Sequence, residues 1–262
     1  MFIMTPLVTV VIPVAPHHEA LAANAIASVQ RQTVLTAVIP YYDKQSRGAG
    51  YARNQGARDT DTPFVSFLDA DDTLAPTFIE QCLNIYTKGH YVYTGWYAGS
   101  RPVMPDAQHP YKGKGFHLVT TLIPTVAYRE VGAFDETLPG HEDADLHFKM
   151  MAAGVCGILA PDYLIHYSPH GARGKSFRAR SDYETIRKQV FERHGGEQVI
   201  MCCGLPDAPG QALPMGEKHE GDVEALTGVR QFPVRIKCAL LAWSALKELL
   251  KNKTKLEKQN HE

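Results

Sequence analysis

Short hydrophobic runs alternate with amphipathic segments along the first part of the chain. Apolar, largely β-branched runs at 7–14, 36–42 and 63–68 predict strands, and apolar residues at helical spacing over 19–32 and 50–58 predict helices between them. Because the strand runs are unbroken, we expect a mostly parallel central sheet with helices on both faces. Ligands of such sheets bind beyond the carboxyl ends of the strands, which makes polar residues at those ends candidates for a site.

The same alternation continues further along the chain. The segment 99–115 is rich in Pro, Gly, Lys and Tyr, and it predicts a long loop of the kind that often carries function. A helix that begins with acidic residues at Glu142 is expected to end near Gly154. The other predicted elements are a helix over 75–88, a strand over 90–98 and a helix over 125–131.

A change in composition divides the chain into three parts. We expect an α/β domain over 1–198, a Gly/Pro-rich linker or wrapped extension over 199–230, and an amphipathic helix with a Lys-rich tail over 231–262. The helical segment has apolar residues on one side and lysines and arginines elsewhere. Docking on the first domain or pairing in a homodimer is favoured for this helix, and contact with a membrane surface is the alternative.

Composition excludes several broad classes. The 262 residues are 44% hydrophobic and 21% charged with a formal net charge of −1, which is typical of a soluble globular protein without a global basic field for nucleic acid. The five cysteines are odd in number and irregularly spaced, which favours a reducing compartment and a cytoplasmic location. The apolar first residues lack a basic leader and predict a strand, and no apolar run reaches roughly 18 residues.

The first acidic cluster lies in the stretch FLDADDTL, where a hydrophobic run ends on Asp69, Asp71 and Asp72. One interpretation is helix capping, with Asp72 or Thr73 expected to cap a helix that starts near Ala75. A second is a phosphoaspartate phosphatase, because the string resembles the first motif of haloacid-dehalogenase-like phosphatases. That alternative is the weaker one, since the string follows two β-α units and no later Gly-Asp motif has the required spacing.

The second acidic cluster lies in GHEDADLHFKM, where Glu142, Asp143 and Asp145 open a helix. Acids in a first turn suit the helix dipole, so a purely structural role is one interpretation. The other interpretation is that a carboxylate from this cluster acts in one site together with the carboxylates of the first cluster, at 69, 71 and 72.

Five stretches in order resemble glycosyltransferase family 2, whose fold is GT-A. The likeness covers about residues 7–170 and is most specific at 52–56, 68–72 and 142–143. It implies a nucleotide-diphospho-sugar transferase fold followed here by a helical extension. The stretches are VTVVIPVAPH, the acid after the second strand, GAGYARNQGA, PFVSFLDADD and VGAFDETLPGHEDADLHFKM.

This resemblance implies a donor site. Asp71 would be a direct metal ligand, with Asp69 on the ribose or on a metal-bound water, and Asp43 would bind the nucleobase. Mn²⁺ is favoured over Mg²⁺ and a UDP-sugar over other donors, although the run after Asp43 departs from the family pattern and leaves the base open. Arg53 would steady the donor phosphate or the Asp-x-Asp loop. The remaining donor residues implied are Pro13, Val14, Ala15 and Ala70.

The resemblance also implies the chemistry. Inversion at the anomeric carbon needs a base for the acceptor hydroxyl, and Asp143 is the candidate, with Glu142 orienting the acceptor or a loop and Asp145 structural. A late histidine completes the metal site in some GT-A enzymes, which makes His166 and His170 further candidates. A local basic segment is a candidate for phosphate or acceptor contacts through Arg173, Lys175 and Arg178.

The stretch HLVTTLIPTVAYREVGAFDETLPGHED also looks like the variant of this family in tailed-phage genomes. The acceptor therefore stays open between a glycan, a protein and a hydroxylated base of DNA. A catalytically silent module that binds nucleotide-sugar or glycan is the alternative outside enzymes, although intact acids at 69, 71 and 143 speak against it.

Overall fold

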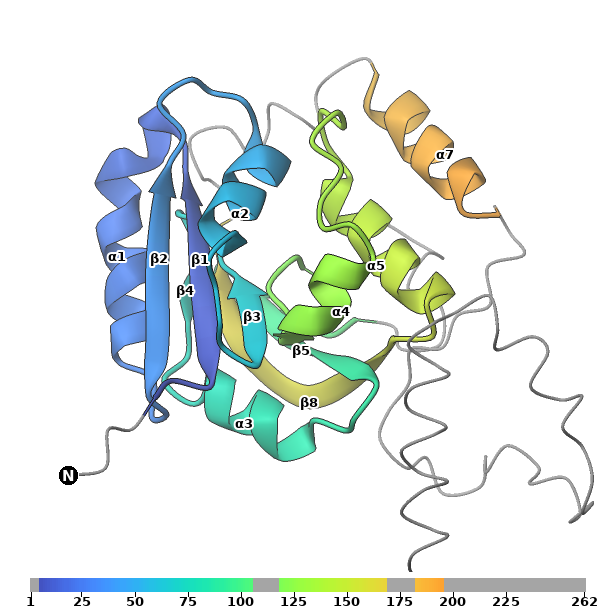
Figure 1. Cartoon of the computed structure of the whole chain (residues 1–262). Helices are drawn as coiled ribbons and strands as arrows, with labels where there is room; N and C mark the ends of the chain where they lie inside the picture. Colours follow the sequence, from blue (N-terminus) through green and yellow to red (C-terminus); the bar gives the residue numbers. More distant parts are fainter. Residues whose placement is uncertain (1–4, 106–117, 169–181, 196–262) are drawn as a thin grey trace, which may run out of the picture. The chain divides into compact units, whose positions relative to one another are not determined.

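The structure is a computed structural model that describes residues 5–105, 118–168 and 182–195 (Figure 1). The chain divides into two compact units, Met1–Ala208 and Pro209–Glu262, and all described residues belong to the first. The predicted linker and the predicted amphipathic helix lie outside the described residues.

The first sheet supplies the parallel core of the fold. The strand β1 (Val8–Val14) lies between β2 (Thr36–Tyr42) and β3 (Phe64–Phe67), parallel to both, and every residue of β1 is buried. The short strand β7 (Ile123–Pro124) adds antiparallel to β3, which makes the order β2-β1-β3-β7. The carboxyl ends of β1, β2 and β3 therefore meet at one edge of the sheet.

The second sheet has the order β4-β8-β5-β6. Its centre is the parallel pair β5 (His90–Ala98) and β8 (Cys156–Tyr167), and the short strands β4 (Thr73–Leu74) and β6 (Arg101–Val103) add antiparallel at the edges. A bridge between Val92 of β5 and Leu122, just before β7, joins the two sheets. The expected α/β architecture with a mostly parallel core and helices on both faces is present, with antiparallel strands at the edges.

Two hydrophobic cores lie on opposite faces of β1, as the two-residue period of a strand requires. Val10 and Ile12 pack with Ala25 of α1 (Glu19–Gln30), whereas Val11 packs in the other core together with residues of α2 (Ala49–Ala57). Figure 1 shows α1 and α2 on the two sides of this sheet. The remaining helices are α3 (Phe78–Ile85), α4 (Thr125–Glu130), α5 (Glu142–Ala152), α7 (Tyr183–Arg193) and the 3-10 turn η1 (Pro16–His18).

The helix α2 lies unusually close to β1 because of one glycine. A Cβ atom on Gly56 would come within 2.4 Å of a Val11 methyl, so a larger residue at this position would push the helix away from the strand. The close packing of α2 against β1 limits how far the helix turn that carries Arg53 can move away from the strand.

Some elements differ from the prediction. The helix expected to start near Ala75 begins at Phe78, and neither Asp72 nor Thr73 caps it: Thr73 lies in β4, and the Asp72 carboxylate accepts a hydrogen bond from the Ser168 amide at 2.8 Å. The strand β6 occupies the start of the segment predicted as a long loop, and the helix α7 was not predicted.

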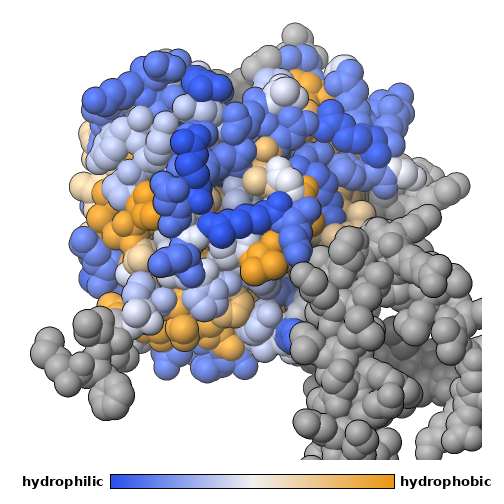
Figure 2. All heavy atoms as spheres, in the orientation of Figure 1, coloured by the Kyte–Doolittle hydropathy of each residue, from blue (hydrophilic) through white to orange (hydrophobic). Residues whose placement is uncertain are grey.

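The described cysteines, the length of the helices and the surface add three further observations. Cys82 is a buried free thiol and Cys156 is disulfide-bonded, whereas the number and spacing of the cysteines favoured a reducing compartment. No helix within the described ranges has the length and apolar character needed to cross a membrane. Figure 2 shows a mixed surface on this face, where polar residues separate several apolar patches.

Candidate active site

The Asp-x-Asp stretch forms a tight turn after β3. The Leu68 amide still bonds to Val11 of the neighbouring strand at 3.0 Å, and the Asp72 amide then bonds back to the Asp69 carbonyl at 3.0 Å. This turn replaces the alternation of a strand, so the side chains of Asp69 and Asp71 need not point to opposite faces. Ala70 between them is buried with 1% exposure, which anchors the turn in the core.

Arg53 of α2 connects the two acidic clusters. One terminal nitrogen of its guanidinium donates to Asp69 Oδ1 at 2.7 Å and the other donates to Glu142 Oε1 at 2.7 Å. The side chain is buried, and its guanidinium carbon lies 5.2 Å from the centre of the Phe134 ring. Burial alone would lower the pKa of Arg53, but the charges of Asp69 and Glu142 outweigh it and raise that pKa.

Asp143 follows Glu142 in the first turn of α5. Burial and then the neighbouring Glu142 charge raise the pKa of Asp143 to about 6, while Arg53 opposes the shift. The charge of Asp69 also raises this pKa, so the two carboxylates interact electrostatically across 74 positions of sequence (143 − 69). Asp143 Oδ1 accepts a hydrogen bond from the Ala144 amide at 2.8 Å.

The start of α5 depends on an unusual residue before it and on α7 beside it. His141 has a left-handed backbone with φ 59°, and its ring lies 4.7 Å from the Tyr183 ring of α7. The buried carboxylate of Asp145 binds Lys149 at 3.1 Å and, from the end of α7, His194 at 2.8 Å. Asp145 therefore joins two helices, in keeping with its expected structural role.

Negative charge accumulates at the Asp-x-Asp turn. Burial and then the Asp69 charge raise the pKa of Asp71, with His18 opposing. Burial and the same neighbour raise the pKa of Asp72 well above its usual range, although the Ser168 amide opposes this. Carboxylates that disfavour one another's ionised form make a site where a cation would be stabilised.

These residues fit a divalent ion that is held partly by substrate. Within the part of the chain that the structure describes, no group of three or more His, Cys, Asp or Glu side chains is arranged to hold a metal. Mg²⁺-type sites commonly use one or two carboxylates and complete the shell with phosphate oxygens and water. Asp71 and Asp69 match that pattern in number and in ligand chemistry.

The carboxyl ends of β1 and β2 carry the residues that the sequence predicts to bind the nucleobase. Asp43 is buried, its amide bonds to the Val14 carbonyl at 2.9 Å, and its Oδ2 accepts from the Gly48 amide at 3.0 Å. Its carboxylate therefore closes the loop that leads into α2. Pro13 and Val14 end β1 beside the last residues of β2, and Ala15 follows as the residue before η1.

Sequence analysis did not select two features of this region, the contact between Arg47 and Tyr51 and the side chain of His18. The Arg47 guanidinium lies 3.6 Å from the centre of the Tyr51 ring, and the Tyr51 hydroxyl is 3.4 Å from that of Tyr41. His18 acts electrostatically on Asp71, and its buried Nε2 has no hydrogen-bond partner among the described residues. His18 could have been selected because it lies shortly after β1, just as Asp69 was selected because it lies shortly after β3.

His166 lies beside the acidic turn by strand pairing, because it is the partner of Thr73 in the β4–β8 pair. It is exposed, and its ring stacks on Tyr97 with 5.5 Å between ring centres. His170, Arg173, Lys175 and Arg178 lie outside the described residues.

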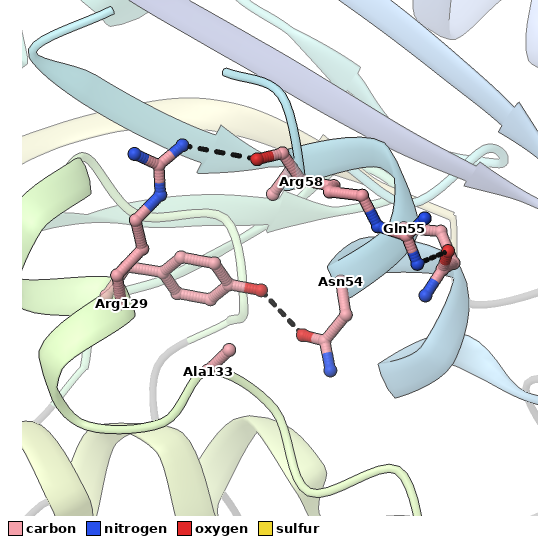
Figure 3. A pocket seen from close by; sticks show the side chains of 7 residues that line it. Asn54, Gln55, Arg58, Arg129 and Ala133 are labelled. Atoms are coloured by element: carbon pink, nitrogen blue, oxygen red, sulfur yellow. Dashed lines mark hydrogen bonds between the residues drawn. The ribbon is translucent and has the colours of Figure 1, made fainter. Parts of the chain in front are cut away.

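A cavity of about 260 Å³ lies beside α2 (Figure 3). None of the acids described above lines it. Its lining residues are Asn54, Gln55, Ala57, Arg58, Tyr128, Arg129 and Ala133.

Comparison with known proteins gives a family match over part of the chain. Residues 35–129 match the family described as Glycosyl transferase family 2, a segment that contains Asp43, Arg53, Asp69 and Asp71. An uncharacterized glycosyltransferase of Rickettsia typhi, RT0329, is 27% identical over 188 residues, or 63% of this chain and 59% of the relative. Over these residues the chain is similar to glycosyltransferase family 2. The chain spans about three fifths of that relative's length.

Solved structures similar to this chain show its fold. A mannosyltransferase from Pyrobaculum calidifontis, in complex with GDP-Man and Mn²⁺, has a TM-score of 0.57 at 15% identity and covers 72% of this chain and 64% of its own. Residues 1–349 of S. aureus TarS, in complex with UDP-GlcNAc, have a TM-score of 0.55 at 14% identity, with coverage of 70% and 65%. The fold is GT-A, as expected.

A short stretch of the chain has a different likeness. Over 42 residues, 16% of the chain, it is 55% identical to the iron-sulfur cluster assembly scaffold protein IscU of Streptococcus pyogenes. The match covers 26% of that protein. A fragment of this length identifies neither a fold nor an activity for this chain.

Proposed function

We propose that this protein transfers a sugar from a nucleotide-sugar donor to an acceptor hydroxyl, with inversion at the anomeric carbon. The observation that carries the proposal is the double ion pair of Arg53 with Asp69 and Glu142. It links the turn after β3 to the first turn of α5, where Asp143 lies. The donor diphosphate and the acceptor hydroxyl would then meet between two sets of carboxylates.

On the donor side, Asp43 and the end of β1 at Pro13–Ala15 would bind the nucleobase. Asp71 and Asp69 would hold Mn²⁺ or Mg²⁺, which when bound neutralises the growing charge of the leaving diphosphate. A similar structure contains GDP-Man with Mn²⁺ and another contains UDP-GlcNAc, which supports a nucleotide-sugar donor. A UDP-sugar is our favoured donor.

On the acceptor side, Asp143 would act as general base. With a pKa of about 6 it is ionised at neutral pH and basic enough to accept the acceptor proton as attack begins. The acceptor oxygen forms a bond to the anomeric carbon while the bond from that carbon to the phosphate oxygen breaks. Glu142, held by Arg53, would orient the acceptor or the start of α5.

The acceptor class stays open between a glycan, a protein and a hydroxylated DNA base, and homodimer or membrane contact through 231–262 stays a prediction. The family match extends over the FLDADDTL stretch and leaves the phosphoaspartate alternative without support. A silent binding module remains the competing function, because binding alone would use the same donor residues.

The decisive experiment uses the full chain. UDP- and GDP-sugars are screened by thermal shift with Mn²⁺, Mg²⁺ or EDTA, because a ligand that binds only the folded state raises the melting temperature. Donors that bind are tested for release of nucleoside diphosphate, with the Asp143→Asn variant as the control. Metal-dependent release that this variant loses supports the transferase, whereas binding without turnover against an acceptor panel supports the silent module.

A further inference from the structure

The side chain of Asn54, next to Arg53 on α2, makes four hydrogen bonds. Its nitrogen donates to the Phe134 carbonyl at 3.0 Å and to Glu136 at 2.9 Å. Its oxygen accepts from the Tyr128 hydroxyl at 2.6 Å, drawn in Figure 3, and from the Phe134 amide at 3.1 Å. A single amide thus binds both backbone polar groups of Phe134 and uses its full hydrogen-bonding capacity.

The backbone that Asn54 binds follows a strained turn. Gly132 has φ 85° and Ala133 has φ 56°, a left-handed conformation that is unfavourable for a non-glycine residue such as Ala133. Such a conformation persists only where surrounding contacts impose it. Asn54 is one such contact, and Lys149 of α5 is another, because its Nζ donates to the Ala133 carbonyl at 2.5 Å.

The ring of Phe134 reaches the site. It is buried with 2% exposure, packs edge-on against Phe67 at 4.9 Å between ring centres, and lies under the Arg53 guanidinium at 5.2 Å. The position of Phe134 therefore limits where the Arg53 guanidinium can lie.

We propose that Asn54 is a positioning residue for the transfer reaction: it fixes Phe134, and through that ring it keeps Arg53 between Asp69 and Glu142. The inference rests on the proposed function for its kinetic consequence, but its structural consequence stands apart from activity. It assigns Asn54 a role in aligning the two acidic clusters and not in contacting substrate.

The kinetic test compares Asn54→Ala with Asn54→Asp and wild type. We expect Asn54→Ala to lower kcat about 10- to 100-fold, because small misplacements of reacting groups are costly, with donor KM changed less than about threefold. Asn54→Asp keeps the acceptor for Tyr128 and for the Phe134 amide but turns a carboxylate oxygen toward the Phe134 carbonyl and Glu136, so a loss of kcat is expected for this variant as well. The control is Thr9→Val, which removes the buried Thr9–Thr62 hydrogen bond of 2.8 Å near the opposite end of β1.

A double-mutant cycle tests whether the effect passes through the ring. In a Phe134→Leu background, Asn54→Ala should change kcat by less than about threefold, because the connection to Arg53 is already lost. All rates are measured well below each variant's melting temperature. Fully additive losses, or a Thr9→Val loss equal to that of Asn54→Ala, would overturn the proposal.

A readout without turnover separates this inference from the proposed function. NMR of the Arg53 guanidinium and hydrogen exchange at the Phe134 amide are measured in wild type and Asn54→Ala. We expect broadened guanidinium signals and faster amide exchange in the variant. Unchanged signals would refute the positioning role even if transfer is observed, whereas the expected changes in a protein without transferase activity would refute only the proposed function.

Discussion

Arg53 and Glu142 lie 89 positions apart in the sequence and form an ion pair of 2.7 Å. The same arginine binds Asp69 at 2.7 Å, so a single buried guanidinium carries the link between α2, the turn after β3 and the start of α5. Because the three segments come from distant parts of the chain, the folded core and not local sequence brings the carboxylates together.

Replacing Arg53 should affect both stability and activity. Arg53→Ala leaves two partly buried carboxylates without their partner, which we expect to cost about 3 kcal/mol of unfolding free energy, measured by urea denaturation at pH 7.5. Activity should fall at least about 100-fold. Arg53→Lys is the matched control: it keeps the charge, but one ammonium cannot bind two carboxylates in a planar fork, so a partial loss is expected. A stable, active Arg53→Ala variant would contradict this account.

The pH dependence of turnover should report Asp143. A general base acts only when deprotonated, so kcat/KM should fall as pH decreases through about 6 and reach a plateau above it. Asp143→Asn should lower kcat about 1,000-fold and remove this acidic limb. The exposed Asp162 of β8 provides the control, because Asp162→Asn should keep both rate and limb. An unchanged profile in Asp143→Asn would exclude this residue as the base.

The same carboxyl should lower stability at neutral pH. Its folded pKa of about 6 exceeds the ordinary value of 3.8, so the folded state binds more protons in that interval and stability decreases as pH rises through it. Asp143→Asn avoids this penalty and keeps an oxygen for the Ala144 amide. We expect its melting temperature to exceed that of wild type at pH 8 and the gap to shrink toward pH 4. A lower melting temperature at pH 8 would refute the raised pKa.

Metal removal should abolish transfer. EDTA treatment is expected to remove activity, and added Mn²⁺ should restore it, with Mg²⁺ less effective. Asp71→Asn should raise the Mn²⁺ concentration for half-maximal activity by about tenfold or more, since it removes a charged ligand. Asp162→Asn serves again as the control. Full activity of the EDTA-treated enzyme would rule out a required divalent ion.

Asp145 should behave differently from Asp143 although it lies on the same helix. Burial raises the pKa of Asp145, but His194 and Lys149 outweigh burial and leave that pKa lowered. A lowered pKa gives stability that is present above the unfolded value and lost as pH falls. Asp145→Asn should therefore lower the melting temperature at pH 7.5 and approach wild type below about pH 4. Its kcat at low temperature should stay within about threefold of wild type.

The outcome for Asp145→Asn separates two explanations of the acidic helix start. A large loss of kcat with an unchanged melting temperature would indicate that Asp145 takes part in catalysis, as is proposed for Asp143. The expected result would assign Asp145 to the attachment of α7.

Pattern alone predicted most of the longer elements. The strands β1, β2, β3 and β5 and the helices α1, α2, α4 and α5 lie where hydrophobic runs and helical spacing indicated, because packing against neighbouring elements selects apolar residues at these periods. The strands β4 and β6 have two and three residues, too few to show a period. The helix α7 buries Ile186 and Val190 with Phe191 partly buried, and most of its other residues are polar, so its apolar pattern was short.

The site residues also divide into those that the sequence could select and those whose role depends on a distant partner. Asp43, Asp69 and Asp71 could be selected because they follow strands, and Asp143 because it resembles a family motif. Asp72 was one of two residues predicted to cap a helix, although its carboxylate binds the Ser168 amide 96 positions away. Local sequence carries no information about a partner so distant.

The sequence by itself determined the α/β architecture, the order of its main elements and the identity of the carboxylates at the strand ends. Only the tertiary structure decided which of those groups meet: Arg53 with Asp69 and Glu142, Asn54 with Phe134, and Asp145 with His194. The physical reason is that periodicity reports which side of an element is buried, whereas an ion pair or hydrogen bond depends on the packing of elements far apart in the chain.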